Sequence, residues 1–441
     1  MIFSYSACGF ATAWDIVRET ASDDWGTVMT NLRLPVGLIV VLGWAGTLCA
    51  QQPKPSDIKR GSIAKLDIAG YAITIKSDGK ELDLIMAEET QVLNSKGKSL
   101  KERLDGFKVG SEINFVAREK DGKLHLSHIR LFDGKGGAPA KVDLAKLVPL
   151  DQLGEKEYQG SQGGFYPDGK NDRPKAHEDA GLRLAKQVEP RDDAGKPAKF
   201  GRIVLLSVGM SNTSQASQGF QRALSGFEQR NPALTFVNGA QGGMTAARIH
   251  NTDTKDGIQY WGTIDQQLKK AGVTREQVQV VWIKQADAGP SSGFPKYAKT
   301  LEGELGHIVR ILPGRFPNVK LVYLSSRTFG GHATSGLNPE PYAYESAFSV
   351  KWLIEKQIKG DVDLAFESDK GTAKAPWLSW GPYLWANPAY KRADGFSYAE
   401  SDFTPNDGTH LTAAGQDKIG RLMVQFFQND TTSRTWFLAR P

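Results

Sequence analysis

The second half of the chain alternates between short, continuously apolar runs and stretches with helical periodicity. The runs lack the polar alternation of a half-exposed strand, so they are typical of strands buried on both faces of a parallel sheet. They occupy residues 203–208, 234–237, 278–283 and 319–324. Between the first two, Phe220, Leu224 and Phe227 recur at the spacing of one helix face. Alternating strands and helices predict a doubly wound α/β domain over residues 201–430.

Residues 61–132 have a different pattern, in which short apolar alternations are broken by turns. Residues 77–80 (SDGK) separate two such alternations, and Asp121-Gly122 separates two more. An Asp-Gly pair between alternating runs is a strong signal for a β-hairpin. About five short strands in so few residues predict a small all-β domain that resembles an OB-fold barrel. The segment contains no catalytic constellation, so we expect an accessory role for it.

The remaining boundaries follow from polar, turn-forming stretches. Residues 51–60 are interpreted as a linker, and residues 133–200 as a linker followed by surface loops rich in Gly, Lys, Asp and Pro. A long insertion occupies residues 327–405 of the α/β domain, and residues 431–441 are expected to form a C-terminal tail.

The first 50 residues contain one strongly apolar run. Residues 34–50 (LPVGLIVVLGWAGTLCA) follow Arg33 and end in a small residue, Ala50. A basic flank, a short apolar stretch and a small final residue predict a secretory signal peptide, and a start at Met29 would leave a compact leader. A membrane anchor is the less favoured alternative, because about 17 residues interrupted by proline and glycine are short for a membrane span.

Cysteine use is consistent with export. The two cysteines, Cys8 and Cys49, both precede the predicted cleavage site, so the mature chain would have neither a disulfide nor a cysteine-based site. Lipid anchoring at Cys49 is not favoured, because Leu48 stands where a small residue is usual. We therefore expect a periplasmic or extracellular protein without a stable membrane span after cleavage.

The charge distribution argues against nucleic acid as a partner. The chain has 55 lysines and arginines against 49 acidic residues, a net charge of +6. The basic residues are scattered among the acidic ones, whereas nucleic-acid-binding domains gather them on one stripe or face. We expect no nucleic-acid binding.

Two places in the chain contain the residue types of a nucleophile and its base. Ser211 stands between the first apolar run of the domain and a helical pattern, where the N–H groups at a helix start favour negative charge. Serine needs a neighbouring base, and residues 407–410 (DGTH) precede the last helical pattern. A carboxylate at Asp407 can hold one nitrogen of His410 and leave the other for the serine proton. Taken singly, each motif is also compatible with a helix cap or a turn.

The order of these motifs resembles that of the SGNH/GDSL hydrolases. Residues 241–245 (QGGMT) follow the second apolar run, and residues 282–287 (WIKQAD) end the third. With residues 209–212 (GMSN), these segments are most similar to the sialate O-acetylesterase and acetylxylan esterase branch, which has G-Q-S-N, G-G-T and Q-G-E there. The chain departs from that pattern at Met210 and at residues 286–287.

The resemblance implies an SGNH-type hydrolase domain and assigns roles within it. The implied catalytic triad is Ser211, Asp407 and His410. The implied oxyanion hole consists of Ser211, Gly242, Gly243 and Gln285. The activity implied is that of a carbohydrate O-acetylesterase, a serine hydrolase whose partner is an acetylated glycan or another small ester.

Aromatic residues in the insertion are candidates for sugar contacts. Residues 377–385 (WLSWGPYLW) precede the triad histidine in the chain, and their rings could either stack on sugars or pack the insertion down. Together with the residue that follows the nucleophile, the candidate substrate-binding residues are Asn212, Trp380 and Trp385.

The histidines are dispersed and show no metal-ligand spacing, so we expect neither a metal nor a cofactor. His332, in a glycine-rich loop, is the one further histidine considered for the site. Two alternatives to a carbohydrate esterase stay open. One is a non-catalytic glycan-binding protein with a degenerate hydrolase domain, motivated by Met210 and Ala286. The other is an esterase or thioesterase for a different acyl substrate.

Overall fold

The computed structural model describes residues 58–77, 79–92, 97, 99–131, 142–367, 373–405 and 407–439. The predicted signal peptide and residues 51–57 of the first linker lie outside these residues, whereas residues 58–60, also predicted as linker, begin strand β1. Within them, no helix combines the length and the apolar character needed to cross a membrane.

The first domain is a small, barrel-like β-sheet. Its strands follow the order β3-β2-β1-β5-β6-β4, and an extra pairing between β3 and β6 brings the two sides of the sheet together. Its elements are β1 (Ile58–Asp67), β2 (Ala72–Ser77), β3 (Lys80–Ile85), β4 (Gln91–Val92), α1 (Leu100–Arg103), β5 (Glu112–Lys120) and β6 (Lys123–Leu131).

Both predicted hairpins of this domain are confirmed. Strands β2 and β3 pair antiparallel, as do β5 and β6. Asp121 and Gly122 both have positive φ, at 53° and 70°, as a tight two-residue hairpin turn requires. The inward-facing residues, among them Ile75, Ile113 and Ile129, are buried in a core of their own.

The second domain is built on a five-stranded parallel sheet. The strand order is β10-β9-β11-β12-β13, and each neighbouring pair is parallel. Its strands are β9 (Ile203–Gly209), β10 (Leu234–Asn238), β11 (Val278–Lys284), β12 (Leu321–Ser325) and β13 (Trp377–Trp380). Every residue of β9, β11 and β12 is buried, which explains why these segments are continuously apolar.

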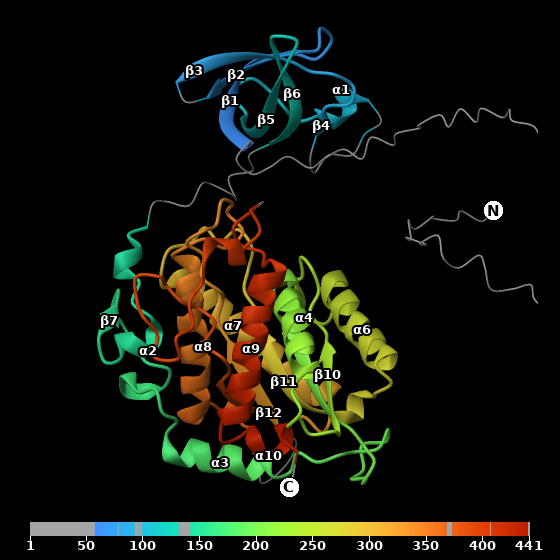
Figure 1. The fold of residues 1–441 in the computed structure, drawn as a ribbon, viewed down its shortest axis with the longest axis vertical. Coiled ribbons are helices and arrows are strands. Elements are labelled where there is room, and N and C mark those ends of the chain that lie inside the picture. The colour runs from blue at the N-terminus through green and yellow to red at the C-terminus, as the bar shows by residue number, and fades with distance from the viewer. Residues whose placement is uncertain are drawn as a thin grey trace, which may run out of the picture. The chain divides into compact units, whose positions relative to one another are not determined.

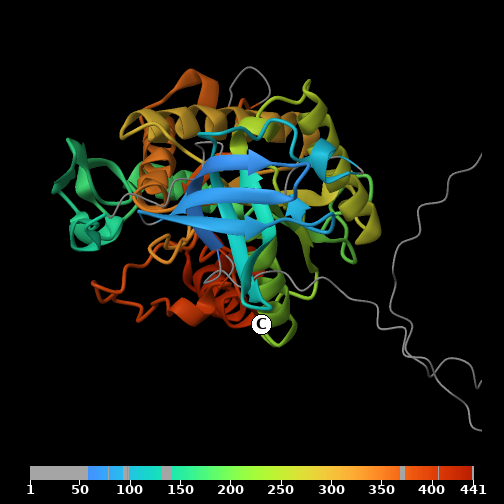
Figure 2. The same cartoon turned by 90° about the horizontal axis from the view of Figure 1, so that it is seen from above.

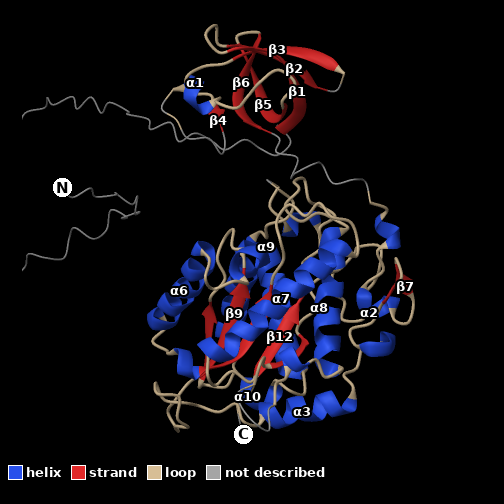
Figure 3. Ribbon diagram, turned by 180° about the vertical axis from the view of Figure 1, so that it is seen from behind, coloured by secondary structure: helices blue, strands red, loops and turns tan. Residues whose placement is uncertain are grey.

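Helices cover this sheet on both sides. Helices α4 and α9 pack together on one face (Figure 1), and α7 and α8 pack together on the other (Figure 3), as the view from above also shows (Figure 2). The longer helices are α3 (Lys175–Ala185), α4 (Ser211–Ser225), α6 (Lys255–Lys270), α7 (Lys296–Arg315), α8 (Tyr342–Ile358) and α9 (Ala413–Asn429). Shorter elements are α2 (Leu150–Leu153), β7 (Glu157–Tyr158), β8 (Ser161–Gln162), α5 (Ala246–Ile249) and α10 (Arg434–Phe437).

Residues 142–200 differ from the prediction of a linker and surface loops. Leu147, Leu150 and Tyr166 are buried in the core of the α/β domain, and the N–H of Leu150 donates to the hydroxyl of Tyr383. Most glycines of the segment are buried, several of them at close backbone contacts, and Lys175–Ala185 form helix α3. The sequence pattern did not reveal this packing because, outside α3, the apolar anchors are few and irregularly spaced, and the face that α3 buries consists mainly of small or polar residues.

Two other boundaries also differ from expectation. The insertion at 327–405 contributes α8 and the sheet's edge strand β13, so it is part of the main fold. The predicted tail forms α10, and its Trp436 and Phe437 are fully buried. Aromatic residues in short segments supply large buried areas without a periodic signal.

Helices α4 and α9 approach each other closely through glycines. A Cβ atom on Gly219 would lie 1.9 Å from the carbonyl oxygen of Gln416, and one on Gly420 would lie 2.2 Å from the carbonyl oxygen of Gly219. No rotamer change can relieve a clash with backbone. This contact sets the separation of two helices that begin at or just after Ser211 and His410.

We expect Gly219→Ala to destabilise the domain by about 1–3 kcal/mol, because it overpacks this helix contact. Gly303→Ala is the matched control, since a Cβ on Gly303 of α7 would meet no atom within 4 Å. In that exposed helical position alanine should stabilise by up to about 1 kcal/mol. Urea unfolding of both variants measures the difference, and equal stabilities would contradict the close packing of α4 on α9.

Candidate active site

Ser211 lies where β9 ends and α4 begins. It is the first residue of α4, so its backbone N–H is one of the groups that have no acceptor within the helix. Gly209, the last residue of β9, lies close to the backbone of Lys284. A Cβ atom on Gly209 would lie 2.3 Å from the carbonyl oxygen of Lys284. The N–H of Gly209 also donates to the buried hydroxyl of Tyr260 on α6, at 2.9 Å. The strand end that presents the serine is therefore rigidly held.

The chain brings Ser211, His410 and Asp407 together. Ser211 Oγ lies 2.8 Å from Nε2 of His410, and the other ring nitrogen, Nδ1, contacts Oδ2 of Asp407. Ser211 and His410 are 199 residues apart in the sequence. The His410 side chain remains 27% exposed, which leaves the serine–histidine pair accessible from solvent.

Asp407 is fixed by more than its histidine. Its Oδ1 accepts hydrogen bonds from the backbone N–H groups of Thr409 and His410, both at 2.9 Å, and from Oγ1 of Thr404 at 3.0 Å. Partial burial acts to raise the pKa of Asp407, but the hydrogen bonds from the His410 ring and from these N–H groups outweigh it, so the pKa lies below its ordinary value. The carboxylate is therefore ionised at neutral pH and orients the imidazole.

The turn that carries Asp407 requires a glycine. Gly408 has a φ of +59°, and a Cβ there would lie 1.7 Å from the carbonyl oxygen of His332. The N–H of Thr334 donates to the carbonyl oxygen of Asp407 at 2.9 Å. His332 thus supports the turn through its backbone, while its ring packs against Phe403.

The Gly242 turn lies close to Ser211. Gly242 stands opposite Ser211, since a Cβ on Gly242 would lie 4.0 Å from the Cβ of Ser211. Among the hydrogen bonds of the described residues, the N–H of Gly242 has no protein acceptor. The carbonyl oxygen of Gly243 accepts from Arg248 at 2.9 Å, which holds this turn. The N–H groups of Ser211, Gly242 and Gly243 all stay candidate oxyanion donors.

Both ends of the Gln285 side-chain amide form hydrogen bonds within the protein, which the sequence did not indicate. It is buried, its Nε2 donates to the carbonyl oxygen of Met244 at 2.9 Å, and its Oε1 accepts from the N–H of Ala286 at 3.0 Å. One of its two amide N–H bonds is thus used to hold the loop that contains Gly242. This contact positions that loop, and the oxyanion role of Gln285 stays a prediction.

Asn212 occupies a structural position rather than an open surface. Its side chain is 1% exposed; Nδ2 donates to the carbonyl oxygen of Thr409 at 2.9 Å, and Oδ1 accepts from Nζ of Lys284. It therefore links the start of α4 to the His410 turn. The predicted direct contact with substrate does not fit this burial.

Lys284 was not foreseen from the sequence. It is fully buried at the end of β11, and desolvation, with the nearby Arg327, holds its pKa well below the ordinary value. Its one signal was a lysine closing an otherwise apolar strand. Through Asn212 and the Thr409 carbonyl, Lys284 connects the central strand to the turn that carries His410.

The two predicted tryptophan contacts also lie inside the fold. Trp385 is fully buried, and its Nε1 donates to Glu340 at 2.7 Å. Trp380 is 3% exposed, and its Nε1 donates to the carbonyl oxygen of Phe165 at 2.7 Å. Trp385 therefore packs the insertion, and Trp380 lines a cavity that contains no triad residue.

A carboxyl pair borders the segment that follows Gln285. Asp287 Oδ1 accepts from the N–H of Ala247 at 2.9 Å, and the carboxyl of Asp287 also faces that of Glu304 on α7. Burial, the charge of Asp287 and a hydrogen bond shared with Asp287 raise the pKa of Glu304 to about 9. Glu304 is therefore protonated at neutral pH and can donate to Asp287.

We expect wild-type stability to fall relative to that of Glu304→Gln as the pH rises from about 5 to 9. The pKa of Glu304 is higher in the folded than in the unfolded state, so its favourable contribution is complete below the unfolded pKa and is lost as the pH rises through the folded pKa. The glutamine keeps a donor to Asp287 and cannot ionise. The side chain is partly solvated, so the expected change is about 1 kcal/mol. Urea unfolding at several pH values measures it, and parallel curves would contradict the assignment.

Among the described residues, no cluster of three or more histidine, cysteine or acidic side chains could hold a metal ion. The arrangement at Ser211 nevertheless contains the parts of metal-independent acyl transfer: an activated hydroxyl, an oriented imidazole and backbone N–H donors.

Comparison with known proteins gives distant structural likenesses. No protein-family model matches the chain, and no curated protein matches it significantly. A candidate SGNH hydrolase from Slackia heliotrinireducens is 13% identical, with 51% of this chain and 99% of that one covered and a TM-score of 0.26.

Two further solved structures are also distantly similar to parts of the chain. The periplasmic domain of a Salmonella ser. Paratyphi A lipopolysaccharide acetyltransferase is 13% identical, covers 57% of this chain and 95% of its own, and gives a TM-score of 0.29. Ag(I)-bound CusF from Escherichia coli is 16% identical over 18% of this chain and 98% of its own, with a TM-score of 0.14. Because these identities and TM-scores are low, the comparisons carry no argument about function. That argument depends on the geometry at Ser211.

Proposed function

We propose that the protein is a serine esterase that works through an acyl-enzyme. Ser211 Oγ attacks the ester carbonyl while Nε2 of His410 takes its proton, and Asp407 stabilises the resulting imidazolium. The N–H groups of Ser211 and Gly242 stabilise the oxyanion, with Gln285 as a third donor. His410 then protonates the leaving alcohol, and finally activates the water that releases the acid from Ser211.

The observation that carries this proposal is the hydrogen-bonded series Ser211–His410–Asp407 at the start of a helix. A serine that only caps a helix needs no histidine at its hydroxyl. A histidine that only caps a helix needs no carboxylate at its other ring nitrogen. The two together are the relay that a serine nucleophile requires.

We further propose that the substrate is an O-acetylated glycan and that the protein acts outside the cytoplasm. The motifs at Ser211, Gly242 and Gln285 are similar to those of the carbohydrate acetylesterase branch, and residues 34–50 have the pattern of a signal peptide. A histidine that is partly exposed beside the nucleophile suits a short acyl group on a large polar alcohol.

Covalent labelling tests the nucleophile directly. A fluorophosphonate probe should phosphonylate Ser211 Oγ with loss of fluoride, and peptide mass spectrometry should locate the modification there. Acetate release from acetylated xylan, and hydrolysis of p-nitrophenyl acetate, then test the substrate class. Labelling at Ser211 without acetate release from any glycan would retain a serine esterase or thioesterase and reject the carbohydrate assignment.

A non-catalytic glycan-binding protein is the second candidate, and one observation favours it. Gln285, the residue expected to complete the oxyanion hole, already donates to the carbonyl of Met244. Losing one oxyanion donor costs on the order of 10²–10³ in kcat. If the purified protein neither reacts with the probe nor hydrolyses p-nitrophenyl acetate faster than its Ser211→Ala variant, the binding function replaces the enzymatic one.

A further inference from the structure

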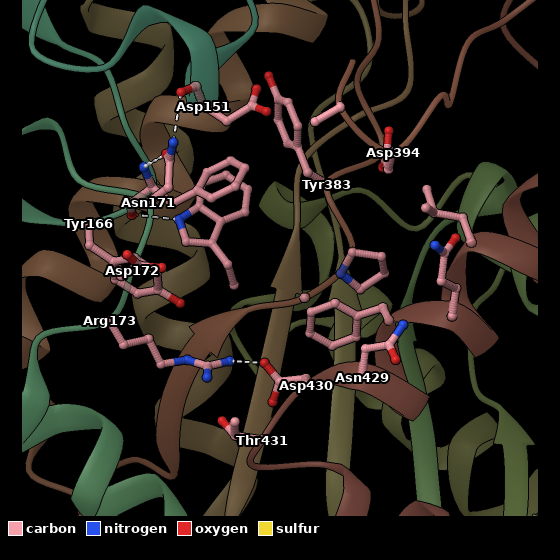
Figure 4. A pocket seen from close by; sticks show the side chains of 18 of the residues that line it. Asp151, Tyr166, Asn171, Asp172, Arg173, Tyr383, Asp394, Asn429, Asp430 and Thr431 are labelled. Atoms are coloured by element: carbon pink, nitrogen blue, oxygen red, sulfur yellow. Dashed lines mark hydrogen bonds and ion pairs between the residues drawn. The ribbon is translucent and has the colours of Figure 1, made fainter.

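A cavity lies at the edge of the parallel sheet, next to β13. Its volume is about 700 Å³, within the range of pockets that bind small molecules. The labelled side chains in Figure 4 surround an open centre, and they come from segments far apart in the chain: residues 151–173, the loop after β13, and the end of α9 with the two residues that follow it. None of Ser211, His410 and Asp407 lines it.

This cavity is separate from the candidate active site. His410 precedes the first residue of α9, whereas the cavity is lined by residues 422–429 near the other end of that helix. At 1.5 Å per residue, this places the cavity about 15–25 Å further along the helix. A ligand in it would not occupy the position of the reacting ester.

Aromatic and apolar groups form one part of the cavity wall. Phe165 packs against Trp380 and Tyr383, with ring centroids 4.9 and 5.1 Å away. Pro382 and Phe426 add further apolar surface to the lining. These groups are held by the core, so the wall exists before any ligand arrives, and apolar faces of this kind are suited to the C–H faces of a sugar ring.

The polar lining is predominantly acidic. Both of its arginines are already paired, Arg173 with Glu178 and Asp430, and Arg392 with Asp394. Asp151 and Asp172 also line the cavity and form no ion pair within the described part of the chain. An anionic ligand would therefore meet uncompensated carboxylates and no available cation, which strongly disfavours it.

Amide and hydroxyl groups stand among these carboxylates. Asn171, Gln425, Asn429 and Thr431 line the cavity, and all four are exposed. Together they offer both donors and acceptors over a surface that also has carboxylate acceptors. Neutral molecules rich in hydroxyl groups are the ligands that such a mixture can satisfy.

We infer that this cavity is a non-catalytic binding site for neutral sugar residues of a glycan, and that it rejects acidic sugars. A polymer held there would keep its ester groups close to Ser211 between turnovers, which raises their effective concentration at the nucleophile. The link to catalysis rests on the proposed esterase function, whereas the existence of the site does not.

Binding to the full chain with Ser211→Ala tests the inference without consuming substrate. Isothermal titration with xylohexaose should give binding at least about tenfold tighter than titration with a galacturonic acid hexamer. The cavity variant is Asp172→Ala/Asn429→Ala, because both residues are exposed and should not affect folding. It should weaken xylohexaose binding by about tenfold or more.

The matched control is Asp179→Ala/Gln428→Ala, the same kinds of residue on α3 and α9 but outside the cavity lining. It should bind xylohexaose like the parent. Four results would each overturn the inference. The acidic hexamer could bind more tightly than xylohexaose, or the two double variants could have equal effects. The protein could bind only tetramethylammonium, a cationic probe, or it could bind no probe at all. Hydrolysis of p-nitrophenyl acetate by the wild type is measured alongside, so a missing sugar site and a missing esterase give different results.

Discussion

Ser211→Ala is expected to lower kcat for p-nitrophenyl acetate on the order of 10⁵-fold while leaving the fold intact. The hydroxyl that would form the acyl-enzyme is lost, and His410 then has no nucleophile to activate. Only background hydrolysis assisted by the N–H groups of residue 211 and Gly242 should remain. Steady-state kinetics at pH 7.5, with thermal unfolding to confirm an unchanged fold, measure the effect.

Ser214→Ala is the control for this variant. Ser214 lies one turn further along α4, and its Oγ accepts from Asn238 at 3.2 Å, so it is a helical serine with an ordinary hydrogen bond. Its replacement should change kcat less than about tenfold. Similar losses in the two variants would mean that the helix start, and not the Ser211 hydroxyl, determines the activity.

The features that follow from local pattern were predictable. Continuous apolar runs locate β9 and β11, because a strand buried on both faces cannot carry polar residues. Asp-Gly at 121–122 locates a hairpin, because that turn needs two residues with positive φ. The pairing of Ser211 with His410 was a hypothesis built on motif order, and their 2.8 Å contact agrees with it.

What depends on tertiary contact was not predictable. Trp385 could equally stack on a sugar or pack the insertion, and only its hydrogen bond to buried Glu340 distinguishes the two. Lys284 closes an otherwise apolar strand, but nothing local indicates that its Nζ would contact Asn212. The anchoring of residues 142–200 depends on a few apolar side chains, such as that of Leu150, that enter the core of the α/β domain. The N–H of Leu150 also donates to the Tyr383 hydroxyl, 233 positions away.

Asp407→Asn is expected to lower kcat/KM about 10⁴-fold, although it only replaces one carboxylate oxygen with an NH₂ group. Oδ1 of Asp407 receives three donors: the N–H groups of Thr409 and His410 and the hydroxyl of Thr404. The single oxygen of an asparagine amide must therefore take that position, which turns the NH₂ group toward Nδ1 of His410. Nδ1 then has to accept, so the ring proton moves to Nε2 and faces Ser211 Oγ. In that tautomer the imidazole cannot take the serine proton.

Thr404→Ala separates this tautomer effect from a general loosening of the carboxylate. It removes one donor to Oδ1 and leaves the contact between Oδ2 and Nδ1 of His410 in place, so a loss below about tenfold is expected. Kinetics with p-nitrophenyl acetate and the rate of fluorophosphonate labelling should fall together in Asp407→Asn. Because the three residues act as one unit, Ser211→Ala/Asp407→Asn should be no slower than Ser211→Ala. A smaller effect of Asp407→Asn than of Thr404→Ala would mean that Asp407 holds the turn and does not orient the base.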